Sequence, residues 1–248
     1  MHSIESMKVI PLLLTLLYFP FAGSAQKTTF NSGVEHSGAM RNVMWKGELY
    51  ATLKTDTLPD NRHLYGLGPV EGLKGEILIL DGITYVSKIE NDGSMKVNQE
   101  KQVGAPFFVY GRCDEWKQFP LTPATVALAD LEKLLDSISV TFTKPFLFRL
   151  TGQFPSAVIH VVNLPDGIKV TNPEMAHTNQ SNFQLEKQEA EIVGFFSKEH
   201  SGVFIHHDSF VHCHLITSDK KQMGHLDALV IDPGLATLWI ASPAVNGK

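Results

Sequence analysis

The sequence predicts an α+β fold that consists mostly of antiparallel β-sheet and contains few helices. Two β-rich segments flank an Asp-Gly dipeptide at 81–82, and only one long segment has clear helical periodicity. Short apolar segments also follow one another toward the C-terminus, at 191–197, 203–207, 210–216, 225–232 and 237–241. Short strands separated by turn residues are typical of an antiparallel meander. With 43% hydrophobic and 19% charged residues, the chain has the composition of an ordinary globular protein.

Two local elements are specified most clearly. The segments EILIL (76–80) and ITYVS (83–87) flank Asp81-Gly82, a dipeptide that favours a type I′ turn, so they predict a β-hairpin. The segment 122–138 predicts a helix, with Thr122 as its N-cap and Pro123 at the first helical position. Its apolar residues form one buried face, composed of Leu128, Leu131, Leu134, Leu135 and Ile138.

Five of the eleven histidines lie between residues 206 and 225. His212 and His214 alternate with apolar residues, so in a strand they share one face. The polar segment 217–223 predicts a turn that leads into a second strand, which contains His225. Three neutral imidazoles on two paired strands can hold a divalent transition metal and leave a position open. The alternative, from spacing alone, is a polar strand face with solvated histidines.

Two charged residues lie in apolar strand segments. Glu76 opens the first strand of the hairpin, where a carboxylate is either solvated or held in a partly dry site with a raised pKa. Arg149 lies within the strand predicted at 146–151 and requires a structural carboxylate or the carboxylate of a ligand. The polar segment 166–188 is predicted to be an excursion or a lid. Four glycines precede the strand at 76–80, namely Gly66, Gly68, Gly72 and Gly75, and they indicate tight turns or close approach of the backbone to a bound ligand.

The N-terminus predicts export. Residues 1–25 combine one lysine, an apolar segment and small residues before Ala25, the pattern of a secretory signal peptide. The apolar segment is short and contains two prolines, so we expect no stable membrane insertion after cleavage. The net charge of -5, without clustered Lys and Arg, disfavours nucleic acid as a partner. Cys113 and Cys213 either form a disulfide or remain two buried thiols.

In order along the chain, these features resemble the α-acetolactate decarboxylase family. The matching motifs are GLGPVEGLKGE (66–76) followed by LDG, an arginine before GQFPS, and a His-x-His pair whose second histidine precedes another by eleven positions. The resemblance implies an α+β fold with mostly mixed and antiparallel sheet in two associated β-rich parts, few helices, and a homodimer. After the signal peptide 1–25, the parts correspond to 26–140, with the hairpin and helix, and 141–248, with the histidines, and together they form one catalytic unit.

The resemblance also implies a site and an activity. The activity is metal-dependent decarboxylation of a small-molecule 2-hydroxy-3-keto acid, with 2-acetolactate to acetoin as the first expectation. His206 and His207 are then bystanders. The chain departs from the family at Pro69, where a threonine is typical, and after Asp232, where the family has a glutamate in its tail. The implied residues are His212, His214 and His225 as ligands of Zn²⁺, with Glu76 and Arg149 as catalytic groups that face the metal.

Two other hypotheses stay open at this point. The first is another three-histidine metalloenzyme, a hydrolase or a dioxygenase, because the same ligand set serves several reactions. The second is an exported zinc-binding protein without this activity, which the additional histidines at 206 and 207 favour. Oxygen-dependent turnover distinguishes a dioxygenase from a decarboxylase, and metal binding without turnover distinguishes a binding protein from either enzyme.

Overall fold

The computed structural model describes residues 33–58, 62–140 and 145–242. The predicted signal peptide at 1–25 lies outside these residues. Within the described part of the chain, no helix is long and apolar enough to cross a membrane. The described residues contain three α-helices, α1 (Met40–Lys46), α2 (Leu128–Ser139) and α3 (Pro173–Ala176), together with two 3₁₀ turns at Thr55–Thr57 and Glu71–Leu73. Helices are few beside the strands, as predicted.

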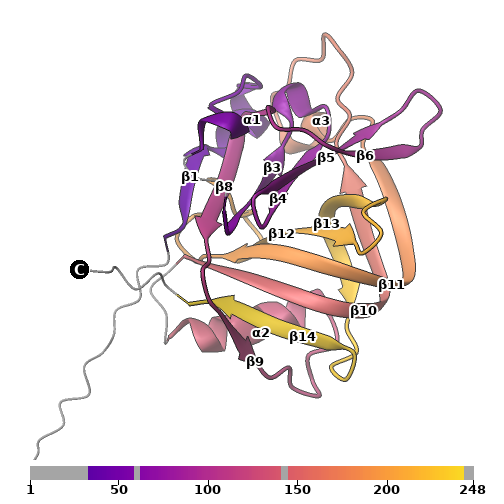
Figure 1. The fold of residues 1–248 in the computed structure, drawn as a ribbon. Helices are drawn as coiled ribbons and strands as arrows, with labels where there is room; N and C mark the ends of the chain where they lie inside the picture. Colours follow the sequence, from indigo (N-terminus) through magenta and orange to yellow (C-terminus); the bar gives the residue numbers. More distant parts are fainter. Residues whose placement is uncertain (1–32, 59–61, 141–144, 243–248) are drawn as a thin grey trace, which may run out of the picture.

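The strands form two six-stranded antiparallel sheets, drawn in the upper and lower parts of Figure 1. The first sheet has the order β1 (Glu35–Gly38), β8 (Phe107–Arg112), β3 (Leu64–Pro69), β4 (Glu76–Leu80), β5 (Ile83–Ile89) and β6 (Met95–Gln99). The second has the order β11 (Ser181–Phe196), β12 (Val211–Thr217), β13 (Met223–Val230), β10 (Phe146–Val161), β14 (Ala236–Ala241) and β9 (Trp116–Phe119). A small pair, β2 (Leu53–Lys54) with β7 (Gly104–Ala105), completes the sheet structure. The predicted fold class is therefore confirmed, while the predicted domain division at 140/141 stays a prediction.

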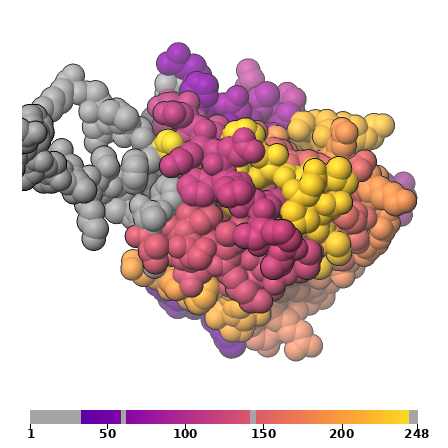
Figure 2. Space-filling view, turned by 90° about the horizontal axis from the view of Figure 1, so that it is seen from below, coloured from indigo at the N-terminus to yellow at the C-terminus, as the bar shows by residue number. Residues whose placement is uncertain are grey.

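The second sheet closes on itself. The 16-residue strands β10 and β11 pair along their whole length, while β10 also pairs with β13 and β14, and β11 with β12. One face carries an apolar core that includes Phe148, Ile159 and Leu215, and α2 packs Leu131 and Leu135 against it. The segment around α2 is visible in magenta and pink in the view from below (Figure 2). The other face packs on the first sheet.

The predicted hairpin is confirmed. Strands β4 and β5 pair from Glu76 with Ser87 to Leu80 with Ile83. Asp81 and Gly82 have φ values of 48° and 81°, the two positive angles that a type I′ turn requires. The glycines before it permit close packing: a Cβ at Gly66 or Gly68 would lie 2.6 or 2.9 Å from the Phe108 ring. The close approach is therefore to the neighbouring strand, β8.

Three local predictions need correction. Helix α2 begins at Leu128 instead of Pro123. Its start differs because Thr125 N–H donates to the Thr122 carbonyl in a turn, and Ala127 is extended and bridges Val230. The segment 181–188 belongs to β11, where its backbone pairs with β10. The segment 203–207 is a loop that contains turns, not a strand.

The cysteines are free and buried, so of the two predicted alternatives the buried thiols are confirmed. Burial raises the pKa of the Cys113 thiol to about 12 and also raises that of Cys213. Neither thiol is therefore ionised near neutral pH. Because the nucleophile and metal ligand is the thiolate, these cysteines belong to the packed interior.

Candidate metal centre

Strands β12 and β13 place three histidines as the alternation predicts. Val211, Cys213 and Leu215 pack into the core on one face of β12, so His212 and His214 point to the other face, toward the first sheet. After the turn at residues 218–222, His225 on β13 pairs in register with His214. Their ring centroids are 5.6 Å apart, and those of His212 and His225 are 5.0 Å apart.

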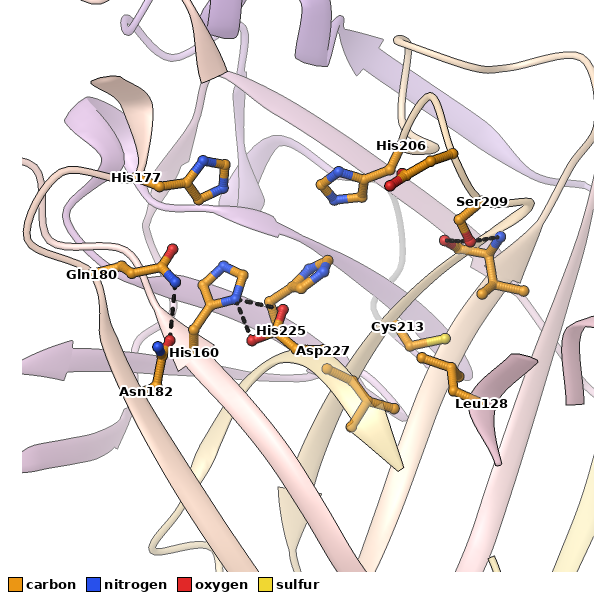
Figure 3. A pocket seen from close by; sticks show the side chains of 13 residues that line it. Leu128, His160, His177, Gln180, Asn182, His206, Ser209, Cys213, His225 and Asp227 are labelled. Atoms are coloured by element: carbon orange, nitrogen blue, oxygen red, sulfur yellow. Dashed lines mark hydrogen bonds and ion pairs between the residues drawn. The ribbon is translucent and has the colours of Figure 1, made fainter. Parts of the chain in front are cut away.

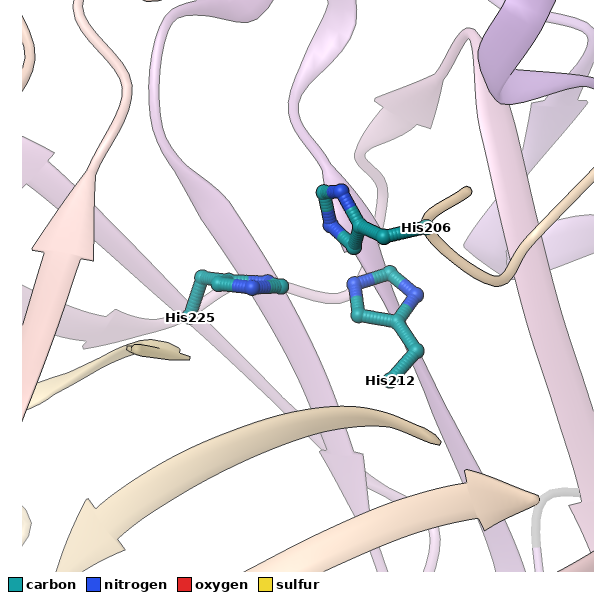
Figure 4. A group of neighbouring side chains, drawn as sticks. All are labelled: His206, His212 and His225. Carbon is teal, nitrogen blue, oxygen red and sulfur yellow. The ribbon is translucent and has the colours of Figure 1, made fainter. Parts of the chain in front are cut away.

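A fourth histidine comes from the loop between β11 and β12. His206, His212 and His225 each offer a ring nitrogen, and these nitrogens lie within 4.8 Å of one another (Figure 4). The loop is fixed by a turn in which Gly202 N–H donates to the Ile205 carbonyl, and by the first turn of α1, where Met40 N–H donates to the Val203 carbonyl. His206, expected to be a bystander, therefore belongs to the group with the best donor geometry.

The histidines of this group are neutral. Burial lowers the pKa of His206 to about 4, and it lowers the pKa of His212 and of His225 well below the ordinary value. The Nδ1–H of His212 donates to the Phe204 carbonyl at 2.8 Å, which leaves its Nε2 lone pair free. A neutral imidazole oriented by a hydrogen bond to a backbone carbonyl is the usual state of a metal-ligating histidine.

His214 and Glu76 form a second, deeper part of the site. Both are buried, with 0% and 3% of their surface exposed, and His214 Nε2 lies 3.6 Å from Glu76 Oε2. Burial raises the pKa of Glu76 well above its usual value and lowers that of His214 to about 3. Both shifts favour the uncharged forms, so the pair is a carboxylic acid beside a neutral imidazole. Glu76 Oε1 also accepts a hydrogen bond from Val162 N–H at 3.3 Å.

His160 and Asp227 lie beside His225. The Nδ1 of His160 lies 2.8 and 2.9 Å from the two carboxylate oxygens of Asp227, and its ring lies 4.7 Å from that of His225. The pairing of β10 with β13 shifts here: Val158 pairs with Ala228 and Ile159 with Leu226, so Asp227 is the extra residue of a β-bulge. Sequence reasoning missed this pair, because its two members are 67 residues apart.

Arg149 lies on the same face of the second sheet as His214, but its side chain contacts other residues. Its register neighbour on β11 is Val193, which in turn pairs with His214, so Arg149 lies two strands from His214. Its Nε is 2.8 Å from Glu191 Oε1, and its guanidinium lies 4.9 Å from the Trp116 ring centroid. Of the two predicted partners, the structure therefore shows a carboxylate of the chain itself.

A polar cavity of about 480 Å³ opens at the histidines (Figure 3). Its lining includes His160, His177, His206, His225 and Asp227. His212, Glu76 and His214 are not part of this lining and are buried, with 2%, 3% and 0% of their surface exposed. A small polar molecule can enter this space and reach the donor nitrogens of His206 and His225.

The residues of this site fit a transition-metal ion. Three neutral imidazole nitrogens and no thiolate are the donor set of catalytic zinc sites, in which a further position stays free for water or substrate. Among the described residues, His214 is fully buried and its ring nitrogens have only weak contacts, with Glu76 Oε2 at 3.6 Å from Nε2 and with the backbone of Ile77. Buried polar atoms normally have well-formed hydrogen bonds, so the weakly held His214 ring is also able to offer a lone pair to a metal ion.

The comparisons with known proteins agree with this architecture. A family profile described as Alpha-acetolactate decarboxylase matches residues 39–241. The alpha-acetolactate decarboxylase of Methanosarcina mazei is 27% identical over 179 residues, which cover 72% of this chain and 59% of that protein. That of Lactococcus lactis subsp. cremoris is 28% identical over 173 residues, 68% of each chain. The chain thus spans less than two thirds of the length of the first relative.

A solved structure shows the same fold. The crystal structure of alpha-acetolactate decarboxylase from Bacillus subtilis strain 168 superposes with a TM-score of 0.67 and covers 84% of this chain and 85% of its own, at 20% identity. This likeness concerns the fold alone. Because the family profile spans both sheets and all the histidines of the candidate centre, the chain belongs to the alpha-acetolactate decarboxylase family.

Proposed function

We propose that this protein is a metal-dependent decarboxylase of a 2-hydroxy-3-keto acid, with 2-acetolactate to acetoin as the first candidate reaction. The observation that carries the proposal is the convergence of three histidine nitrogens within 4.8 Å at the polar cavity. Membership of the family supports the same reaction. An exported zinc-binding protein without this activity is the second candidate, which the same histidine group would also serve.

The reaction requires a group that accepts the electron pair of the broken bond and a group that donates a proton. When the bond between C2 and the carboxylate breaks, carbon dioxide leaves and its electron pair remains at C2, conjugated with the adjacent ketone. A bound divalent ion, Zn²⁺ in our proposal, supplies the Lewis acid that stabilises the negative charge on the ketone oxygen. His212 and His225 would hold it, with His214 as third ligand by family resemblance or His206 by the geometry of the structure.

Glu76 is our proposed proton donor. Burial raises the pKa of Glu76 and so favours its protonated carboxyl, the state that a general acid must have before the reaction. Val162 N–H holds Oε1, which leaves Oε2 on the side of His214. In the proposal this proton goes to C2 after carbon dioxide has left, and water restores it afterwards.

Arg149 is proposed to orient the substrate carboxylate. The support is its place on the same face as His214, two strands away, and the planar guanidinium, which binds carboxylates in a bidentate manner. This role requires Arg149 to exchange Glu191 for the substrate. Export and a homodimer are further parts of the proposal, which rest on the N-terminal sequence pattern and on the family.

The test is a turnover assay on purified protein whose zinc content has been measured. We expect racemic 2-acetolactate to yield acetoin and one carbon dioxide per molecule, without oxygen uptake. The handedness of the acetoin reports whether one face of C2 receives the proton. Oxygen-dependent turnover would instead identify a dioxygenase, and full zinc occupancy without turnover of any 2-hydroxy-3-keto acid would identify a binding protein.

A further inference from the structure

A second cavity adjoins the polar one and differs from it in chemistry. We call it the α1 cleft, about 340 Å³ in volume. It is lined by the apolar side chains of Met40, Met44, Trp45 and Pro173 and by polar residues that include Arg41, His177, His206 and Asp208. His177 and His206 also line the polar cavity, so these histidines form part of the wall of both spaces. We propose that the α1 cleft receives an apolar substituent of the substrate and thereby determines how long this substituent can be. This proposal rests on the proposed function.

The position of the cleft supports this role. His206 contributes a donor nitrogen to the candidate metal centre and at the same time forms part of the cleft wall. A molecule whose polar groups lie at His206 and His225 therefore has its remaining atoms directed either back into the polar cavity or into the cleft. The position of the His177 ring, which lines both cavities, is fixed because its Nδ1–H donates to the Pro173 carbonyl at 2.6 Å.

The walls of the cleft are apolar on the side away from the histidines. Met40 and Met44 are buried, whereas Trp45 is 60% exposed at the rim of the cleft. Methionine side chains adapt to ligands of different shapes, and a partly exposed indole gains from being covered by an alkyl group. Helix α1 is anchored to the loop that carries His206, because the N–H groups of Met40 and Arg41 donate to the carbonyls of Val203 and Gly202. The cleft and the histidine group are thus held by one framework.

The size of the cleft identifies the substituent. A methyl group occupies about the volume of one water molecule, roughly 30 Å³. A cleft of about 340 Å³ is far larger than the methyl groups of acetolactate require. The structure therefore favours 2-hydroxy-3-keto acids with a longer alkyl or aromatic substituent, while acetolactate remains a small member of the same series.

The experiment separates binding from turnover. The full-length, zinc-loaded protein is titrated calorimetrically with unreactive 2-hydroxy-2-methyl acids whose second alkyl group lengthens from methyl to pentyl. The variants are Trp45→Ala, Trp45→Phe and, as a matched control, Tyr50→Ala, an aromatic residue that is 83% exposed and lines neither cavity. Turnover of the corresponding 2-hydroxy-3-keto acids is measured in parallel.

In the wild type and in Tyr50→Ala, we expect affinity to rise about fourfold for each added methylene. In Trp45→Ala the rise should fall to about twofold, since one wall is lost, and Trp45→Phe should lie between them. A wild-type affinity that does not change with chain length, or an unchanged trend in Trp45→Ala, would overturn the proposal. If affinity rises with chain length but no acid is decarboxylated, the role of the cleft is supported and the proposed reaction is refuted. If acetolactate is decarboxylated but affinity does not depend on chain length, the reaction is supported and the role of the cleft is refuted.

Discussion

The face of the second sheet that packs on the first carries two polar regions, and they differ in how their polar atoms are satisfied. In the arginine region, the opposite charges of Arg149 and Glu191 lie 2.8 Å apart, and Trp116 covers the guanidinium. In the histidine region, His214 lies 3.6 Å from the uncharged Glu76 and beside the neutral rings of His212 and His225, so no opposite charge faces it. Two opposite charges are each other's counterion and stabilise the fold, whereas neutral donor nitrogens gathered in one buried place can receive a cation.

The strongest test of this difference is loss of a histidine ligand. We expect His212→Ala or His225→Ala to reduce zinc affinity by more than the roughly 10–100-fold that follows loss of an outer-sphere partner, and to abolish turnover. Metal analysis of the purified proteins measures the effect. His36→Ala, an exposed histidine on β1, is the control and should keep its zinc.

The third ligand is identified by a matched pair of variants. If the nitrogen geometry of the structure holds with metal bound, His206→Ala loses zinc and His214→Ala retains it; the family assignment expects the opposite result. Loss of zinc in both would show a centre of four histidines. If both variants retained zinc, neither His206 nor His214 would be required as a third ligand.

Replacement of Glu76 affects the reaction more than the binding of metal. Glu76→Gln retains the shape of the side chain and the acceptor for Val162 N–H, but it removes the proton. We expect unchanged zinc content and a loss of turnover of about 10²–10⁴-fold, the usual contribution of a general acid. Turnover within a few-fold of the wild type would show that the proton comes from elsewhere.

Acid should destabilise the histidine region specifically. The pKa values of His206 and His214 are lowered to about 4 and about 3 in the folded protein, below the ordinary value of 6.5. Below pH 6.5 the unfolded chain binds protons that the folded protein does not, so stability is complete above this pH and decreases as the pH falls toward 4. The slope is at most about 1.4 kcal/mol per pH unit for each such histidine.

Urea denaturation of the metal-free protein at several pH values measures this slope. His214→Gln should reduce it, because glutamine does not titrate. Glu191→Gln, in the arginine region, should leave the slope between pH 6.5 and 4 close to that of the wild type. A slope that does not respond to His214→Gln would show that other groups cause the acid sensitivity.

The smallest expected effect is that of breaking the arginine pair. Glu191→Gln should lower the free energy of unfolding by about 1–2 kcal/mol, less than the 3–5 kcal/mol typical of a fully buried pair, because the two side chains remain 24% and 19% exposed. Zinc content should not change. If Arg149 also orients the substrate, Arg149→Ala raises KM, while Glu191→Gln lowers stability without raising KM.

Local sequence rules predicted the parts of the fold that depend on neighbours in the chain. Asp81-Gly82 specified a hairpin because few other residues adopt two positive φ angles in succession. The alternation in β12 specified which side His212 and His214 face, because a strand has a period of two. The apolar face of α2 was also correct, although the helix begins five residues later than predicted, at Leu128 instead of Pro123.

Features that depend on distant residues were not predictable in this way. His206 reaches the metal group because a turn at Gly202 and the start of α1 fix its loop, and no pattern around His206 indicates either contact. The polar first half of β11 has no sequence pattern typical of a strand, and it forms a strand because its backbone pairs with β10. The partner of Arg149 is on another strand, 42 residues away at Glu191.

The bulge at Asp227 indicates how a functional group can enter a β-sheet without disturbing it. Val158 pairs with Ala228 and Ile159 with Leu226, so the ladder on either side of Asp227 is already complete. Deletion of this one residue would join two consecutive pairs and leave every other side chain on its present face. Asp227 therefore occupies the place of an inserted residue, and we expect its deletion to remove the carboxylate that contacts His160 while the register of the sheet is preserved.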